Sequence, residues 1–138
     1  MPLLSTNKNL AVQGFVLKLV NNNCPELQAL REGPRLEGRA NLTIVVRVVP
    51  VEGERILARQ AFSAVTKEFS TMGVALVLQE PRGLDEAMLG FRWRGSLTWI
   101  RAKAKHLNPM GGGFYQLGFR MIEKLNASDH PELQAICI

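Results

Sequence analysis

The feature that most constrains the fold is a series of short β-like runs joined by turn residues, with little helical pattern between them. β-branched and aromatic residues are concentrated in the runs, and glycine, proline and asparagine separate them. The runs are Gly14–Val20, Leu42–Val49, Arg55–Phe69 (one bent strand or two short ones), Val74–Leu78, Leu89–Arg94, Leu97–Leu107 and Phe114–Met121. Closing the sheet removes its exposed edges, so the pattern predicts a mainly β protein, a small antiparallel barrel of about six or seven strands.

Short helices are expected only on the flanks of this barrel. Pro25–Arg31 has proline in its first turn and is predicted to be a helix that ends before Pro34. A second short helix is expected around Pro131–Ile136, and Asn108–Gly113 is predicted to be a flexible hairpin connection. We divide the chain into an N-terminal extension at 1–30 (a strand plus a short helix), a barrel domain at 31–125 and a C-terminal tail at 126–138.

The length and charge of the chain limit the classes of partner. A chain of 138 residues supports one domain with a single core. Its formal charge of +5 favours an anionic partner, which could be a nucleotide, a nucleic acid, or an acidic protein or membrane surface. No apolar run approaches the ~20 residues of a membrane helix, and the N-terminus has no signal pattern. We therefore expect a cytoplasmic protein without a membrane span.

The residues typical of catalytic and metal centres are sparse. Cys24 and Cys137 lie far apart in the sequence and lack metal-ligand spacing, so we interpret them as ordinary thiols. His106 and His130 have no neighbouring cysteine or paired carboxylates in the sequence. We expect no metal, no cofactor and no enzymatic reaction.

Two arginines stand four positions apart just before the first strongly β-like run. Arg31 and Arg35 flank a Gly-Pro pair, and guanidinium groups match phosphates bidentately and stack on flat rings. Two arginines on such a loop could converge on one phosphorylated ligand, although solvated arginines after a helix would show the same pattern. Arg39 forms a second, overlapping pair with Arg35 and is an alternative second arginine.

A second polar group ends the next part of the β pattern. Glu68 and Ser70 point to the same face in extended backbone, and Gly73 permits a turn or a close backbone approach. A carboxylate accepts two hydrogen bonds and matches the two adjacent donors on the Watson–Crick edge of guanine. The serine hydroxyl could donate to a phosphate. The same residues would also suit a strand end with a polar tip and a turn glycine.

Together, these signatures resemble the PilZ family, the bacterial receptor domains for cyclic di-GMP. That family carries Arg-x-x-x-Arg before its barrel, Asp/Asn-x-Ser-x-x-Gly at a strand end, and a last strand of the aromatic-x-x-Gly-hydrophobic-Arg type, here Phe114–Met121. The resemblance implies that Arg31 and Arg35 grip phosphates and stack on guanine, and that Ser70 supports a phosphate while Gly73 permits the turn. It also implies a receptor that signals by ordering its arginine loop, read by a downstream protein partner.

Glu68 departs from the family pattern, which has Asp or Asn at this position. The extra methylene moves the carboxylate by about one bond, ~1.5 Å. A degenerate PilZ-like adaptor that binds a protein and no nucleotide is therefore the first alternative. The second is a basic nucleic-acid-binding barrel, because Phe91, Trp93 and Trp99 alternate with arginines. Core aromatics with outward arginines would produce the same alternation, so nucleic acid is the weaker interpretation.

Overall fold

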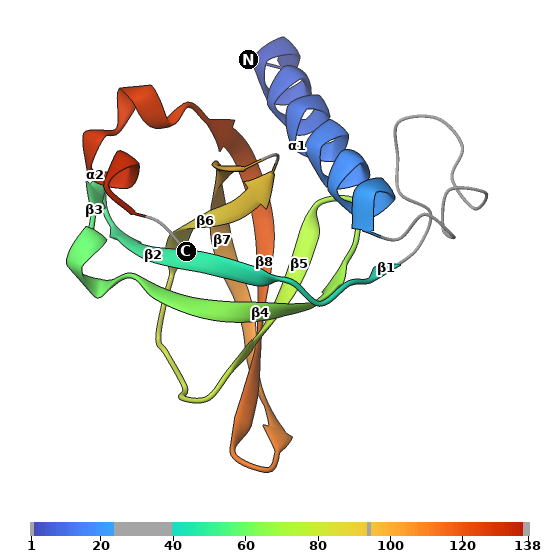
Figure 1. Cartoon of the computed structure of the whole chain (residues 1–138), viewed down its shortest axis with the longest axis vertical. Coiled ribbons are helices and arrows are strands. Elements are labelled where there is room, and N and C mark those ends of the chain that lie inside the picture. The colour runs from blue at the N-terminus through green and yellow to red at the C-terminus, as the bar shows by residue number, and fades with distance from the viewer. Residues whose placement is uncertain (1, 24–39, 94, 137–138) are drawn as a thin grey trace.

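The protein is mainly β, and its central element is a closed antiparallel barrel (Figure 1). The computed structural model describes residues 2–23, 40–93 and 95–136. Six strands form the ring in the order β4-β5-β8-β7-β6-β2, and pairing of β2 with β4 closes it. Their bounds are β2 Val45–Glu52, β4 Phe62–Phe69, β5 Gly73–Leu78, β6 Glu86–Trp93, β7 Ser96–Gly111 and β8 Phe114–Leu125. The predicted fold class is thus confirmed.

Alternation along the strands fills the barrel. Val46 and Val48 of β2 are fully buried, and they share one apolar cluster with Leu76 of β5 and Leu89 of β6. Phe91 packs between Phe69 and the N-terminal helix, with its ring centroid 5.9 Å from that of Phe69. Because successive strand residues point to opposite faces, the residues between these positions are on the outer surface.

Two short strands and a 3-10 turn complete the sheet. β1, Ala40–Asn41, pairs with Phe69 and Glu68 at the end of β4. β3, Arg55–Ile56, pairs with the end of β2, and η2, Ala58–Gln60, leads into β4. The predicted run Arg55–Phe69 is therefore two strands with a 3-10 turn between them.

The N-terminal segment is a helix where the sequence pattern predicted a strand. α1 spans Pro2–Asn23, so the prediction of a strand at Gly14–Val20 is wrong. Val12, Phe15, Val16 and Leu19 are buried against the barrel, at the i, i+3, i+4, i+7 spacing of one helix face. Burial of this stripe outweighs the β propensity of its valines. The predicted helix Pro25–Arg31 lies outside the described residues.

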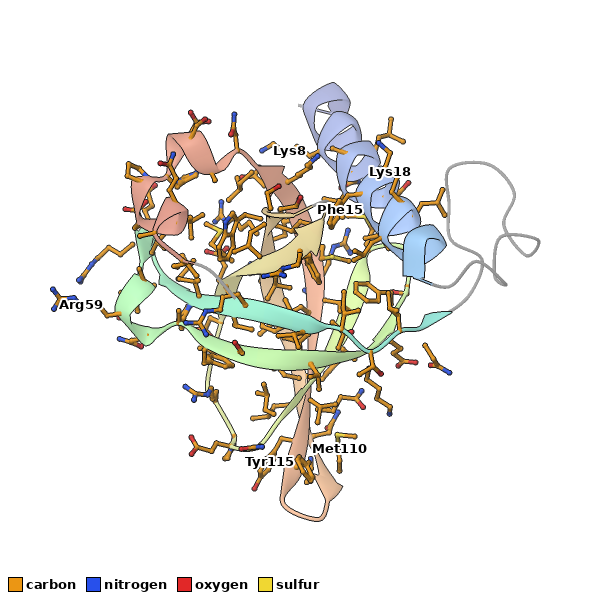
Figure 2. All side chains as sticks on the ribbon, in the orientation of Figure 1. Lys8, Phe15, Lys18, Arg59, Met110 and Tyr115 are labelled. Atoms are coloured by element: carbon orange, nitrogen blue, oxygen red, sulfur yellow. The ribbon has the colours of Figure 1, made fainter. Side chains whose placement is uncertain are left out.

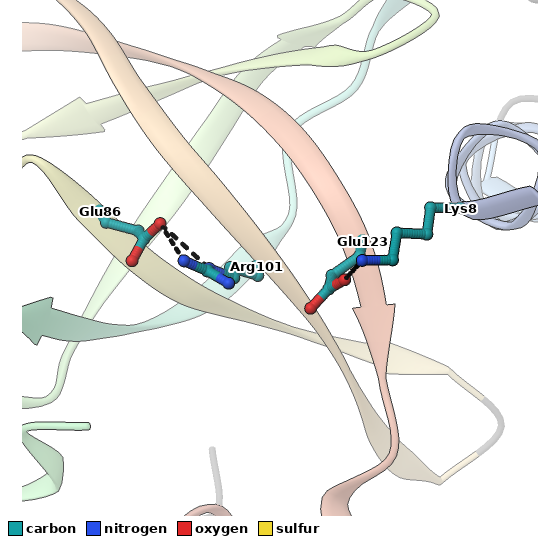
Figure 3. A network of polar contacts seen from close by, with 4 residues as sticks. All are labelled: Lys8, Glu86, Arg101 and Glu123. Atoms are coloured by element: carbon teal, nitrogen blue, oxygen red, sulfur yellow. Dashed lines mark hydrogen bonds and ion pairs between the residues drawn. The ribbon is translucent and has the colours of Figure 1, made fainter. Parts of the chain in front are cut away.

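An ion pair also connects α1 to the barrel. Lys8 Nζ lies 2.8 Å from Glu123 Oε2 on β8, whereas Arg101 on β7 pairs with Glu86 on the neighbouring β6 (Figure 3). The Lys8 side chain is 55% exposed, so this contact adds little free energy beside the buried stripe.

The β7–β8 hairpin is longer than the sequence pattern predicted. β7 continues through Asn108 and Pro109 to Gly111, and the hairpin projects beyond the barrel body (Figure 1). Only the end of the predicted connection Asn108–Gly113 is a turn. Gly111, Gly112 and Gly113 have φ values of 91°, 64° and 84°, a region that favours glycine.

A second apolar cluster lies outside the barrel, on β2, β6 and β7. Trp99 is 1% exposed there and packs with Val49, Met88 and the tail residue Leu133. The tail consists of η3, Ala127–Asp129, and α2, Pro131–Gln134, which brings Leu133 onto the sheet. We call this surface the covered face.

Candidate functional site

The predicted residues Glu68, Ser70 and Gly73 line one hollow of about 270 Å³ on the outside of the barrel. We call it the barrel hollow. It lies over the end of β4, the start of β5 and the middle of β8 and β7. Its remaining lining residues are Phe69, Val74, Ala75, Lys105, His106, Asn108, Gln116, Gly118 and Phe119.

A row of aligned residues forms the floor of the hollow across four strands. Glu68 on β4 is the register partner of Ala75 on β5, and Ala75 is the partner of Gly118 on β8. Gly118 is in turn the partner of His106 on β7. Two small residues therefore lie between a carboxylate and an imidazole, which makes the middle of the row its lowest part.

The hollow at Gly118 is open because no neighbouring side chain fills the position. A Cβ atom built there would find only the His106 carbonyl oxygen, at 3.9 Å, which is ordinary contact. Gly118 is not among the glycines with positive φ. Neither packing nor backbone conformation therefore requires glycine at this position.

Gly73 has the opposite character. A Cβ atom there would lie 2.7 Å from Ser70 Oγ. The two residues close the β4–β5 turn, because Ser70 N–H donates to the Gly73 carbonyl at 2.9 Å and Gly73 N–H donates to Ser70 Oγ at 3.1 Å. The glycine serves a close approach and not a positive φ. The Ser70 hydroxyl hydrogen is not used in this pair and could donate to an anion.

Two β-bulges direct charged side chains toward the hollow. The β4–β5 register shifts between Thr66 and Glu68, and the β7–β8 register shifts between Ala104 and His106. A bulge places an extra residue in one strand and changes the direction of nearby side chains. At the second bulge, the consecutive residues Lys105 and His106 both line the hollow.

A buried threonine holds the incoming chain next to this site. Thr66 is 1% exposed, and its Oγ1 donates to the Leu42 carbonyl and accepts from Ile44 N–H at 2.9 Å. These bonds attach the segment between β1 and β2 to β4. Together with the pairing of Ala40 and Asn41 to Phe69 and Glu68, they position the chain entry at the rim of the hollow.

The arginines Arg31, Arg35 and Arg39 lie outside the described residues. Their sequence position is still informative, since Arg39 directly precedes Ala40, the register partner of Phe69. The chain that carries the three arginines therefore joins the barrel beside Glu68.

The aromatic residues of the nucleic-acid interpretation are mostly unavailable for base stacking. Phe91 is fully buried inside the barrel and Trp99 is buried on the covered face. Arg101 pairs with Glu86, with its Nη2 2.8 Å from Oε1. The Trp93 side chain lies outside the described residues. Packing in the two apolar clusters explains why aromatic residues occur at Phe91 and Trp99.

The described residues contain neither a cluster of metal ligands nor a helix suited to a bilayer. Within the ranges 2–23, 40–93 and 95–136, no three His, Cys, Asp or Glu side chains come together as a metal site would require. Neither helix in these ranges combines the length and apolar character needed to cross a bilayer.

Four polar residues of the hollow were not predicted as site residues from the sequence: Lys105, His106, Asn108 and Gln116. Gln116 accepts a hydrogen bond from Lys67 Nζ at 3.0 Å, which connects β8 to β4 across the rim. The alternation of β7, with Ile100, Ala102 and Ala104 facing the core, could have indicated an outward Lys105. The bulge between Ala104 and His106 then brings His106 to the same face.

Comparison with solved structures supports the barrel fold. The chain is similar to the inhibitor of motility MotI/DgrA of Bacillus subtilis, with a TM-score of 0.50 and 14% identity. The match covers 70% of this chain and 46% of that chain, so it spans about half of the neighbour's length. No family model and no curated protein matches the sequence. At this identity the likeness concerns the fold.

Proposed function

We propose that the protein is a PilZ-type receptor domain that binds cyclic di-GMP in the barrel hollow. The observation that carries the proposal is that Glu68, Ser70 and Gly73 surround one hollow, and that β1 brings the chain carrying the arginines to its rim. The name of the structural neighbour, an inhibitor of motility, fits a regulatory role without catalysis.

The chemistry of the hollow suits this ligand. The Glu68 carboxylate accepts the two donors on the Watson–Crick edge of one guanine. The Ser70 hydroxyl donates to a phosphate oxygen, and the floor at Ala75 and Gly118 leaves space for the flat base. Arg31 and Arg35 close over the ligand from the lead-in segment, where each guanidinium can hold a phosphate or stack on a guanine.

The size of the hollow indicates how the site is completed. Pockets that enclose a drug-sized ligand usually measure about 300–1,000 Å³. At about 270 Å³ the barrel hollow holds only part of a dinucleotide. The remaining surface of the ligand is covered by the arginine segment, and its ordering on binding is the change that a downstream protein partner detects.

Isothermal titration of the full chain with cyclic di-GMP at low salt tests the proposal. We expect micromolar binding, because two phosphate contacts and two stacked bases together reach the ~8 kcal/mol of such a complex. Arg31→Ala and Arg35→Ala should each weaken it about ten-fold or more. Arg59→Ala is the matched control, because Arg59 lies on the η2 turn (Figure 2) and is not among the residues that line the hollow. No binding at high micromolar ligand would remove the proposal.

Glu68→Asp tests the adaptor alternative. If the protein is a cytoplasmic adaptor that has lost nucleotide binding, the natural chain would show no affinity for cyclic di-GMP. The Glu68→Asp variant would then show a large gain in that affinity. A receptor that uses Glu68 would bind before the change, and its affinity would change by less than about ten-fold. Salt-dependent binding of oligonucleotides in preference to the cyclic dinucleotide would instead favour the nucleic-acid alternative.

A further inference from the structure

We propose that Lys105 and His106 of β7 form a second cationic contact for the ligand, on the side of the barrel hollow opposite Glu68. The inference rests on the proposed function and extends it, since it assigns the phosphate groups a partner on the barrel itself. The arginine segment would then be one of two cationic sides of the site.

The position of the pair follows from the bulge between Ala104 and His106. In a regular strand two consecutive side chains point to opposite faces, so only one of them could reach an outer hollow. Here both Lys105 and His106 line it, and both are exposed. The bulge thus doubles the number of basic side chains that β7 presents at this point.

The distance across the floor fits a two-base ligand. Glu68 and His106 stand at the two ends of the row that runs through Ala75 and Gly118. Three interstrand spacings separate them, about 14 Å along the sheet. A guanine edge at Glu68 therefore places the phosphate ring over the small residues, with Lys105 and His106 beyond it.

The electrostatic setting favours an anion at this place. The stretch from Ala102 to Ile122 contains no aspartate or glutamate, whereas it contains Lys103, Lys105 and Arg120. Lysine is a compact charge with three donors, and a histidine ring can donate to a phosphate oxygen or stack on a base. Glu68, at the other end of the row, is the acidic residue that lines the hollow.

Lys103 provides a matched control. It lies two residues before Lys105 on the same strand and is exposed. Its register partner on β8 is Arg120, which is in turn the register partner of Gly73 on β5. It is not among the residues that line the hollow. Lys103→Ala and Lys105→Ala remove the same charge from the same strand, so a difference between them measures position and not net charge.

The experiment is titration of the full chain and its variants with cyclic di-GMP at two salt concentrations. We expect Lys105→Ala and His106→Ala each to weaken binding about ten-fold, the effect of one hydrogen bond to a charged group. Lys103→Ala should stay within about two-fold. Lys105→Ala should also reduce the salt dependence of the affinity, because one phosphate contact is lost.

The possible failures can be told apart. If the natural chain binds no cyclic di-GMP, the proposed function fails and this inference fails with it. If it binds, and Arg35→Ala weakens it while Lys105→Ala and His106→Ala behave like Lys103→Ala, the receptor stands and the second cationic contact is wrong. Equal weakening by Lys103→Ala and Lys105→Ala would indicate a general charge effect and would also overturn the contact. Thermal unfolding of each variant checks that these exposed positions leave the fold intact.

Discussion

Two outer surfaces of the same barrel are built in opposite ways around a glycine in the middle of a strand. On the covered face, Gly90 of β6 lies under Trp99, and a Cβ atom there would come within 2.8 Å of the indole ring. In the barrel hollow, no described side chain fills the space above Gly118 of β8. A Cβ atom built there would meet only the backbone oxygen of His106, at 3.9 Å. A filled site contributes stability, and an open site is available to a ligand.

The two surfaces also differ in the side chains that cover them. Leu133 of the C-terminal tail closes the covered face, and Val49 and Met88 pack beneath it. The barrel hollow is lined instead by charged and polar side chains such as Glu68 and Lys105. The comparison predicts that substitutions on the covered face change the free energy of unfolding, whereas those in the hollow change ligand affinity.

Trp99→Ala is the largest test of this comparison. Removing a fully buried tryptophan leaves a cavity that the tail and β6 can close only in part, so we expect a loss of about 3–5 kcal/mol in the free energy of unfolding. Urea denaturation followed by circular dichroism measures it. A loss below about 1 kcal/mol would mean that the covered face does not contribute the stability assigned to it.

Gly90→Ala should have the next largest effect. The added methyl group would overlap the indole of Trp99, which cannot move freely because Leu133 packs in the same cluster. Overpacking of this kind costs about 1–3 kcal/mol in the free energy of unfolding. The same denaturation experiment applies, with Gly118→Ala as the control. Equal unfolding midpoints for the two variants would contradict the distinction between the filled and the open glycine.

Lys8→Ala tests the surface contact between α1 and β8. Since Lys8 is more than half exposed, we expect a loss of less than about 1 kcal/mol, and the difference from the natural chain should shrink at high salt. Thermal unfolding at two ionic strengths measures this. A much larger loss would show that the ion pair, and not the buried stripe, holds the helix.

Gly118→Val should change the stability least of all. Valine suits a strand and the position has space, so the free energy of unfolding should stay within about 1 kcal/mol of the natural value. The side chain would occupy the floor of the barrel hollow, and binding of cyclic di-GMP should fall by about ten-fold or more. Strong destabilisation would show that the position is packed, and unchanged binding would show that the ligand does not use the floor.

The barrel could be predicted from the sequence because its strands carry a local signal. Runs such as Leu42–Val49 and Val74–Leu78 are dense in β-branched residues and end at turn residues. The helix α1 was mispredicted because Gly14–Val20 carries the same composition. The spacing of Val12, Phe15, Val16 and Leu19 could have corrected the prediction, since periodicity and not composition distinguishes the two structures.

The candidate site was predictable only where its residues are close in sequence. Glu68, Ser70 and Gly73 belong to one strand end, so local reasoning was enough to group them, and the structure places them around one hollow. Lys105 and His106 join them through strand pairing between distant parts of the chain, and a bulge brings His106 to the outer face. Such long-range geometry leaves no local pattern, and the roles of Arg31 and Arg35 stay predictions.

The apolar core that α1 shares with the six-stranded ring has a consequence for the barrel without its helix. Phe15 of α1 packs against Phe91 inside the ring, with ring centroids 5.9 Å apart. The helix therefore covers the apolar end of the barrel and is part of its core. Displacing α1 would expose these apolar core residues to water. A chain shortened to begin after α1 would leave these apolar residues exposed at the end of the barrel, and we expect it to self-associate.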